Sequence, residues 1–351
     1  MSTLPRIRHA VHCLQTTHIR KGKARRFLLG VSQLSLREFT SLNAAGRNLG
    51  LNRWTGENRI RRLVTDIELC RQVQRLLIRE AFASRQGYWY CSLDHSQFGP
   101  FCIAVLALSN RAGRAIPVWV QVNASEAALI APLLTALEGL FMDLAVIAPR
   151  LKLVLVMDRW FAADKLLTLI ASHDYYFVAR TKSDKKVATP WDQYWQRSSI
   201  REVSPLETLV TYRQHRLRLI RSDLKSGMKD PEPWFLLTNL PNTQHTGDAA
   251  GVTRCQLLHR YAERFEIEES FKDLKWLQRL EWQRIRKPEV IRTVLLFMFL
   301  GWWLLWRYVA PVPNRTTPQK KARPKKQLSW FRAAWEQWLQ LTQPPLLALL
   351  A

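Results

Sequence analysis

The chain has few acidic residues for its length. Its 351 residues include 28 Asp and Glu against 53 Lys and Arg, which gives a formal net charge of +25. A basic excess of this size predicts a polyanionic partner, and nucleic acid is the commonest one. Because 47% of the residues are apolar and 11% aromatic, the chain can bury a sizeable core. This composition excludes wholesale disorder and a collagen-like fibre.

Cysteine is also scarce. The five cysteines are scattered and form neither a CxxC motif nor a Cys/His metal spacing, so we expect reduced thiols and exclude a disulfide-stapled secreted domain. The N-terminal segment lacks a signal-peptide pattern, because Arg and His interrupt each apolar run before residue 26. We therefore expect a cytoplasmic protein.

Long uncharged apolar runs are nearly absent. One such run covers residues 293–306, and Arg292 and Arg307 bracket it. About 14 residues is shorter than the roughly 20 that cross a bilayer, so the run predicts a buried core helix. The alternative is membrane association through this helix and the basic tail, which release of the protein at high salt would exclude.

Charge divides the chain into zones. Residues 1–86 hold 17 basic and 5 acidic side chains, whereas residues 87–180 hold seven of each. Helices expected at 41–49 and 55–63, with Gly50 in the turn between them, predict a helix-turn-helix-like DNA-binding domain. Its second helix would offer several side chains to phosphates and base edges, namely Arg53, Asn58, Arg59, Arg61 and Arg62. The alternative is an ordinary basic helical bundle.

The neutral zone alternates strands and helices. Apolar and aromatic runs predict three antiparallel strands at residues 88–93, 101–108 and 116–122. A helix at 125–144, a buried strand at 151–157, a second helix at 162–172 and a last strand at 175–179 are expected to follow. This is the element order of the ribonuclease-H-like fold. The expected fold class is therefore α/β, with a mixed five-stranded sheet, a β-rich insertion and an α-helical N-terminal domain.

Five segments follow from these patterns. We expect a helical DNA-binding domain at residues 1–86 and the first part of the catalytic core at residues 87–181. A β-rich insertion is expected at residues 182–244, and the second part of the core, with a long helix, at residues 245–310. A basic Pro/Lys/Arg-rich tail with a short helix is expected at residues 311–351.

Two aspartates close predicted strands. Asp94 ends the first strand and Asp158 the buried fourth strand, and these two strands lie side by side in a sheet of this order. Converging carboxylates are costly unless a cation lies between them, and a hard divalent ion with oxygen ligands fits that place. Either aspartate alone is equally typical of a turn or a helix cap.

A long helix, expected from residue 252 past 275, supplies further polar groups. Tyr261, Arg264, Glu268 and Lys275 stand at offsets 0, 3, 7 and 14, within one stripe at about 100° per residue. Such a face would offer a carboxylate to a metal, beside two cations and a phenol for phosphates. The alternative is a solvated face with an Arg264–Glu268 ion pair.

The segment YAERFEIEESFKDLKW carries the pattern Y-x2-R-x3-E-x6-K. It resembles the signature of the insertion-sequence-four family of bacterial DDE transposases. Asp94 and Asp158 take the places of that family's first two acids, and the resemblance spans roughly residues 36–310. Two features depart from it: Arg159, Trp160 and Phe161 follow the second acid, and the chain is shorter than many relatives, which often make dimer contacts near their C-termini.

The resemblance implies a transposase that binds the terminal inverted repeats of an insertion sequence. Asp94, Asp158 and Glu268 would be catalytic and would hold two Mg²⁺ ions, with Mn²⁺ as a substitute, for DNA cleavage and strand transfer. Tyr261, Arg264 and Lys275 would bind phosphates of the DNA, and Arg159 would also contact DNA. If cleavage passes through a DNA hairpin, Trp234 of the segment WFLLT would stack on a base that is flipped out of the duplex.

The implied partners are double-stranded terminal repeats, target DNA and a second copy of the chain. The protein would be at the bacterial nucleoid when it is bound to DNA, and no membrane partner is expected. Two other functions stay open at this point. A nuclease or resolvase of the same fold would hydrolyse DNA without joining strands. A catalytically inactive or domesticated relative would only bind DNA.

Overall fold

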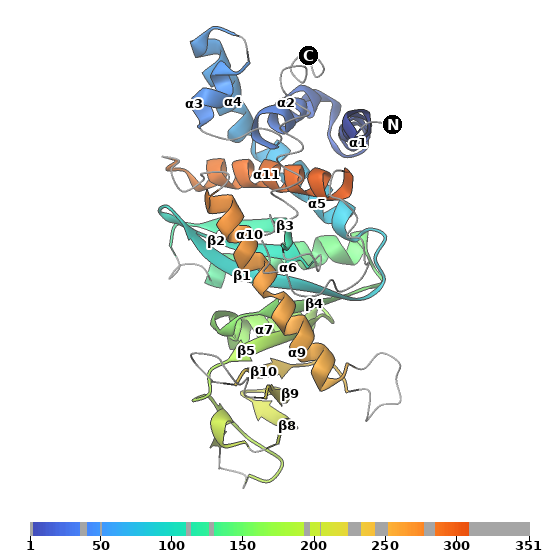
Figure 1. Ribbon diagram of the computed structural model, residues 1–351, viewed down its shortest axis with the longest axis vertical. Helices are drawn as coiled ribbons and strands as arrows, with labels where there is room; N and C mark the ends of the chain where they lie inside the picture. Colours follow the sequence, from blue (N-terminus) through green and yellow to red (C-terminus); the bar gives the residue numbers. More distant parts are fainter. Residues whose placement is uncertain are drawn as a thin grey trace, which may run out of the picture. The chain divides into compact units, whose positions relative to one another are not determined.

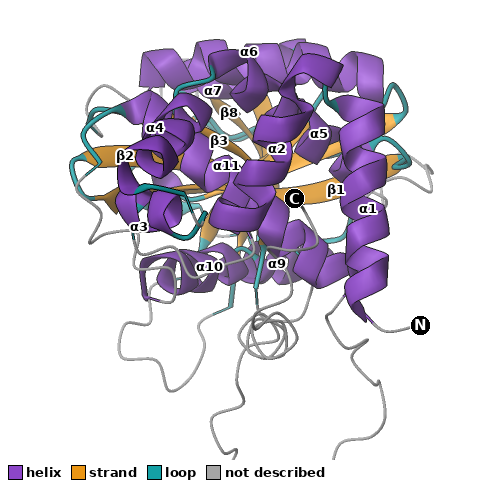
Figure 2. Cartoon of the chain, turned by 90° about the horizontal axis from the view of Figure 1, so that it is seen from above, coloured by secondary structure: helices purple, strands orange, loops and turns teal. Residues whose placement is uncertain are grey.

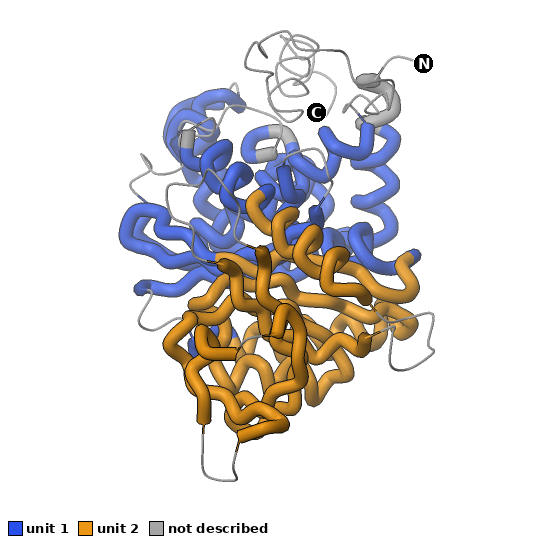
Figure 3. Tube along the Cα trace, turned by 60° about the horizontal axis from the view of Figure 1, so that its bottom comes forward, with its two compact units in different colours: residues 1–84, 95–133, 266–351 blue, residues 85–94, 134–265 orange. Residues whose placement is uncertain are grey.

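The computed structural model describes most of the chain. The described residues are 3–35, 41–49, 51–109, 114–125, 130–192, 197–203, 205–223, 233–242, 252–276 and 285–308. The chain forms two compact units (Figure 3): the first comprises residues 1–84, 95–133 and 266–351, and the second comprises residues 85–94 and 134–265. Gly50 and the tail with its expected short helix lie outside the described residues.

The described part of the first unit is mostly helical. Its helices are α1 (Thr3–His18), α2 (Ala24–Gly30), α3 (Leu42–Arg47), α4 (Arg53–Val64), α5 (Ile67–Phe82), α10 (Phe265–Trp276, from Glu266 on) and α11 (Pro288–Tyr308), with a 3₁₀ turn η1 (Lys21–Lys23) and a π turn η2 (Val31–Ser35). Its strands are β2 (Phe101–Leu108) and β3 (Ile116–Asn123), which pair antiparallel, and the last residues of β1 (Gly87–Phe98) lie beside β2.

The helix α11 forms the core of this unit. It packs against α5 and β3 (Figure 1), and its side chains from Val290 to Leu305 are almost all buried. By length and composition two described helices could cross a membrane, α11 and α6 (Ile130–Ile147). Because 83% of the apolar α11 window is buried inside the protein, α11 is placed as a core helix.

The helices α3 and α4 form a tight pair. Ser41 caps α3 and Asn52 caps α4, each by accepting a hydrogen bond from the backbone N–H three residues on. The two helices touch through glycines: a Cβ added at Gly56 would lie 2.2 Å from the carbonyl oxygen of Gly46. Only glycine permits so close a backbone approach.

Asp66 joins α5 to the segment that precedes α2. Its carboxylate caps α5 at the Leu69 N–H (3.1 Å), accepts from Lys23 Nζ (2.7 Å) and is paired with Arg26. Burial raises the pKa of Asp66, but the hydrogen bonds from Lys23, Leu69 and Arg26 outweigh it and hold the pKa below its ordinary value.

We expect Asp66→Ala to lower the free energy of unfolding by about 1–2 kcal/mol, the usual cost of a lost N-cap. Because the folded-state pKa is lowered, this stabilisation is present at neutral pH and is lost as the pH falls through the folded pKa. Urea unfolding at pH 7 and in acid measures both effects, with Glu138→Ala on the exposed side of α6 as the control. Equal stability of Asp66→Ala and wild type at pH 7 would contradict the expectation.

The second unit is a mixed sheet with helices on both faces. Its strand order is β1-β4-β5-β10-β9-β8, where β4 is Leu151–Met157, β5 Tyr176–Thr181, β8 Glu207–Tyr212, β9 His215–Arg221 and β10 Phe235–Thr238. The strands β1, β4 and β5 are parallel, and β10, β9 and β8 are antiparallel. The helices α6 and α7 (Asp164–Ser172) cover one face, and α9 (Arg254–Glu263) covers the other (Figure 2).

These strands agree with the expected mixed α/β fold. The order is β3-β2-β1 in the first unit and β1-β4-β5 in the second, and β1 runs through both units. The strands β8, β9 and β10 of the expected β-rich insertion join the sheet of the core. The strand β10 pairs with β5, with Phe235 opposite Thr181, and so extends the sheet beyond the expected five strands. Only the short pair β6 (Lys186–Val187) and β7 (Ser198–Ser199) stands apart among the described strands.

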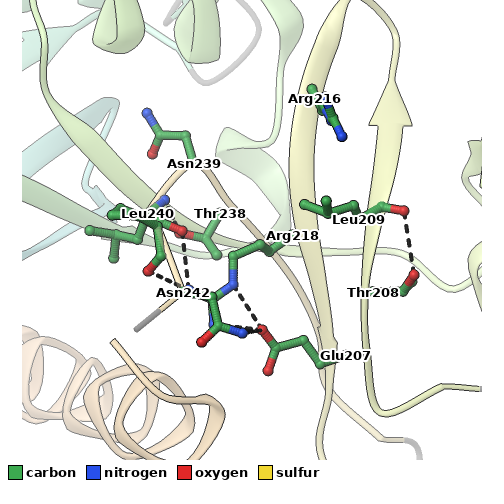
Figure 4. Close-up of a pocket in the computed structure, with 10 residues that line it drawn as sticks. Glu207, Thr208, Leu209, Arg216, Arg218, Thr238, Asn239, Leu240 and Asn242 are labelled. Atoms are coloured by element: carbon green, nitrogen blue, oxygen red, sulfur yellow. Dashed lines mark hydrogen bonds and ion pairs between the residues drawn. The ribbon is translucent and has the colours of Figure 1, made fainter. Parts of the chain in front are cut away.

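A buried arginine holds the insertion together. The guanidinium of Arg218 on β9 donates to Glu207 of β8 and to the carbonyl oxygen of Leu240 (Figure 4). It also donates to the carbonyl oxygens of Pro241 and Val252. It therefore ties two strands to the chain that leads into α9. A cavity of about 470 Å³ lies beside it, and its lining also includes Arg216, Asn239 and Asn242. The amides of Asn239 and Asn242 are already bonded within the protein, to residues 175 and 177 and to Glu207.

Candidate active site

Asp94 and Asp158 lie side by side on neighbouring parallel strands. The register of β1 against β4 pairs Leu93 with Met157, and each aspartate is the next residue in the chain. Asp158 follows β4 as expected, but the expectation that Asp94 ends its strand is wrong, because β1 continues to Phe98 and its last residues lie beside β2. Neighbouring strands are about 4.8 Å apart, so the aspartates begin side by side. Asp94 is buried and Asp158 is half-buried.

Both aspartates belong to the face of the sheet that α9 covers. Side chains alternate between faces along a strand, so Asp94 continues the row of Tyr90, and Asp158 continues the row of Val156. Val156 and Tyr90 pack in the hydrophobic cluster that contains Tyr261 of α9. The carboxylates are therefore next to that helix.

The sequence determines where α9 begins and which side it buries. Thr253 and Gln256 form a capping box, in which each side chain accepts from the other residue's backbone N–H. Leu257 and Tyr261, four residues apart, are both fully buried. This spacing turns one side of α9 onto the sheet.

Tyr261 contacts the second aspartate. Its side chain is fully buried, and its hydroxyl lies 3.5 Å from Oδ1 of Asp158. Burial raises the pKa of Tyr261 to about 12. The phenol is therefore protonated at neutral pH and donates to the carboxylate.

Arg264 contacts the first aspartate. Only 3% of Arg264 is exposed, and its Nη1 donates to Oδ2 of Asp94 at 2.5 Å. The same guanidinium lies 4.9 Å from the ring centroid of Phe265. A buried cation thus compensates the buried carboxylate, which would otherwise be strongly destabilising beside a second acid. The carboxylates of Asp158 and Asp94 are therefore in contact with Tyr261 and Arg264, the first two residues of the pattern Y-x2-R-x3-E.

The long helix expected here is two helices, α9 and α10, which meet at Arg264. The N–H of Arg264 bonds to the carbonyl of Tyr261, three residues back, so the turn is tightened although its backbone dihedrals stay helical. Glu268 and Lys275 follow on α10, in the first unit, where both are half-buried. Lys275 Nζ lies 5.2 Å from the ring centroid of Phe98.

Within the first unit α10 is firmly anchored. Glu266 accepts from Ser109 (2.8 Å), and Asp273 accepts from Arg114 (2.6 Å). Ser270 donates to the carbonyl of Ala115 at 2.8 Å. These bonds fix the rotation of the helix that carries Glu268.

Trp234 lies next to Tyr261. It immediately precedes β10, is half-buried and meets the Tyr261 ring edge-on at 5.0 Å. The ring of Phe265, which is 40% exposed, is 6.0 Å away. Phe265 was not singled out from the sequence, although an aromatic residue directly after Arg264 was visible there.

A basic pocket of about 300 Å³ lies in the second unit. Its lining includes four cationic side chains, those of Arg159, Arg180, Lys182 and Arg201. Of these four residues, only Arg159 was predicted from the sequence to contact DNA. Arg180 and Lys182 come at the end of β5, the strand beside β4, so the strand-end rule that identified the two aspartates would also have found them.

Comparison with protein families finds one that matches more than half of the chain. Residues 100–304 match the family described as "Transposase DDE domain". Asp158 and Glu268 lie inside the matched range, and Asp94 lies just before it. Comparison with curated proteins found no match. On this family match, together with the mixed sheet and its paired aspartates, the chain belongs to the DDE transposases.

Proposed function

We propose that this chain is a transposase of the insertion-sequence-four type, which cleaves DNA at the ends of its element and joins those ends to target DNA. One observation carries the proposal: Tyr261 and Arg264 of the pattern Y-x2-R-x3-E contact the carboxylates of Asp158 and Asp94, which follow paired residues on adjacent parallel strands. A motif that served only a solvated helix face would not be buried against two acids.

Asp94 and Asp158 fit the first two ligands of a divalent metal site. Among the described residues no group of three or more His, Cys, Asp and Glu side chains could hold an ion, so Glu268 is assigned as the third ligand from its place in the motif. The donor set is oxygen only, as Mg²⁺ prefers, and the buried Asp94 already needs a cation beside it. DDE transposases generally use divalent ions, and we assign Asp94, Asp158 and Glu268 to hold two Mg²⁺ ions, with Mn²⁺ able to replace them. Bound ions would polarise the attacking and leaving oxygens of an in-line displacement at phosphorus.

The chain's own residues would prepare that site. Tyr261 holds one carboxylate in place through its protonated phenol, and Arg264 neutralises the other until the metal binds. The half-buried Lys275 is assigned to a backbone phosphate of the DNA. Trp234, beside Tyr261, is assigned to stack on a base flipped out at the element's end on a hairpin route.

The basic pocket would take a DNA phosphate. Arg159 directly follows Asp158, and Arg180 lies near enough to Tyr261 to influence its titration. Guanidinium groups bind phosphate in bidentate fashion, so a pocket with three of them suits the backbone of a strand that enters the site. This assignment extends the single contact expected at Arg159.

The proposed substrate is the terminal inverted repeats of an insertion sequence. The helices α3 and α4 would read these repeats, and pairing of two ends implies a dimer on DNA. Such a protein would work at the nucleoid of a bacterial cell. The net charge of +25 supports a large phosphate interface, so binding should weaken steeply as salt rises.

The test is a cleavage and joining assay. Purified protein is incubated with a labelled duplex that carries the terminal repeat of its element, with Mg²⁺ or with EDTA, beside Glu268→Ala. We expect nicking at the end of the repeat with Mg²⁺ only, its loss in Glu268→Ala, and joining of the 3′-hydroxyl end to an unlabelled duplex.

Two other outcomes would each favour another function. Cleavage without any joined product would indicate a nuclease or resolvase. Salt-sensitive binding without cleavage in Mg²⁺ or Mn²⁺ would indicate a domesticated DNA-binding protein, which retains the acids as part of its fold.

A further inference from the structure

The exposed face of α4 carries an unusual side chain. Trp54, in the first turn, is 77% exposed, although large aromatic residues are normally at least half-covered. Asn52 caps the helix at Thr55 N–H with a 2.8 Å bond, so the helix start is well defined. The tryptophan therefore projects from an ordered element.

Helical periodicity places three polar side chains beside Trp54. At about 100° per residue, Asn58, Arg61 and Arg62 fall within roughly 80° of Trp54 around the helix axis. Arg61 and Arg62 are exposed and Asn58 is half-buried. This set of four residues is the reading face of α4.

The opposite side of α4 is fully used for packing. Gly56, Ile60, Leu63 and Val64 are buried there. A Cβ at Gly56 would meet the backbone of Gly46 at 2.2 Å, so α3 lies directly behind α4. The reading face is thus the side turned away from the core of the first unit.

Charge on α4 indicates the occupant. Arg53, Arg59, Arg61 and Arg62 are exposed, and the one acid of the helix, Glu57, is paired with Arg53 at 3.1 Å. Three guanidinium groups remain for a polyanion. Duplex DNA accounts for the whole set, because its major groove offers phosphates, base edges and the apolar thymine methyl group.

We propose that the reading face of α4 enters the major groove and that Trp54 determines specificity through apolar contact with a thymine methyl group. Asn58 and the two arginines have the chemistry to read adenine and guanine edges beside it. This inference rests on the proposed function, because it assumes that the chain recognises the ends of its element. It names the residues that choose those ends, and Trp54 is not among the residues singled out from the sequence.

The test is selection of sites by the full-length protein from a random duplex library. Wild type is compared with Trp54→Ala, with Trp54→Phe, which keeps an apolar ring, and with Trp191→Ala. Trp191 is a matched control because it is 57% exposed and lies in the second unit. Because Trp54 makes little contact within the protein, thermal unfolding should be the same for all four proteins.

We expect wild type and Trp191→Ala to select the same motif. Trp54→Ala should lose the thymine preference at one or two positions and bind the selected duplex roughly tenfold more weakly, with non-specific binding unchanged. Trp54→Phe should keep most of the preference.

An unchanged motif and affinity in Trp54→Ala would overturn the inference and leave the proposed function standing. An unchanged motif with lost self-association would also overturn it, since Trp54 would then contact a second copy. If wild type bound no duplex at all, the proposed function and the inference would both fail.

Discussion

Asp158→Asn should lower metal-dependent strand cleavage by on the order of a thousandfold while DNA binding stays within about twofold. The loss of one anionic metal ligand removes several kcal/mol of charge stabilisation from the displacement at phosphorus. Asp158 is half-buried at the end of β4, and its partner Tyr261 can bond an amide oxygen equally well, so the fold should survive. Single-turnover cleavage of a terminal-repeat duplex and a gel-shift titration measure the two effects.

Asp174→Asn is the matched control. Asp174 is exposed in the same unit and has a φ of +56°, a conformation that asparagine tolerates as well as aspartate. Its cleavage rate should equal that of wild type. Equal cleavage by Asp158→Asn and wild type would remove Asp158 from the site, whereas lost DNA binding would mean that the substitution disturbs more than the metal.

The local sequence predicted the strands of the core well. The apolar runs at 101–108 and 151–157 coincide with β2 and β4, because buried strands need continuous or alternating apolar residues whatever surrounds them. The same patterns led to Asp94 and Asp158. Each follows an apolar run, and parallel pairing brings the two residues together, although Asp94 lies within β1 and only Asp158 follows the end of its strand.

Burial of Arg264 could not be predicted in the same way. From the helical spacing, Tyr261 and Arg264 were interpreted as groups that face phosphates, yet both are buried against the aspartates. The partner of Arg264 is 170 residues away in the chain, so no local pattern indicates it. Their contact with phosphates stays a prediction. The pairing of β10 with β5 is missed for the same reason, because sheet extension depends on an unpaired edge far away in the sequence.

Arg264→Met should destabilise the metal-free protein by about 3–5 kcal/mol, which is typical when one partner of a buried ion pair is removed. Methionine fills a similar volume but leaves the Asp94 carboxylate buried beside Asp158 without its guanidinium partner. The pKa of Asp94 should then rise, since burial and a neighbouring like charge both favour the neutral form. Urea unfolding in EDTA measures the loss of stability.

The same variant separates a metal site from a purely structural ion pair. If the aspartates hold a divalent ion, Ca²⁺ should raise the melting temperature of Arg264→Met more than that of wild type, because the ion supplies the missing positive charge. Asp94→Asn/Arg264→Met, which lacks the buried charge, should recover much of the stability and lose most of the Ca²⁺ response. A double variant no more stable than Arg264→Met would show that packing, not charge, sets the cost. An equal Ca²⁺ response in wild type, Arg264→Met and the double variant would mean that calcium binds elsewhere, and Arg264 would then be a structural partner of Asp94 alone.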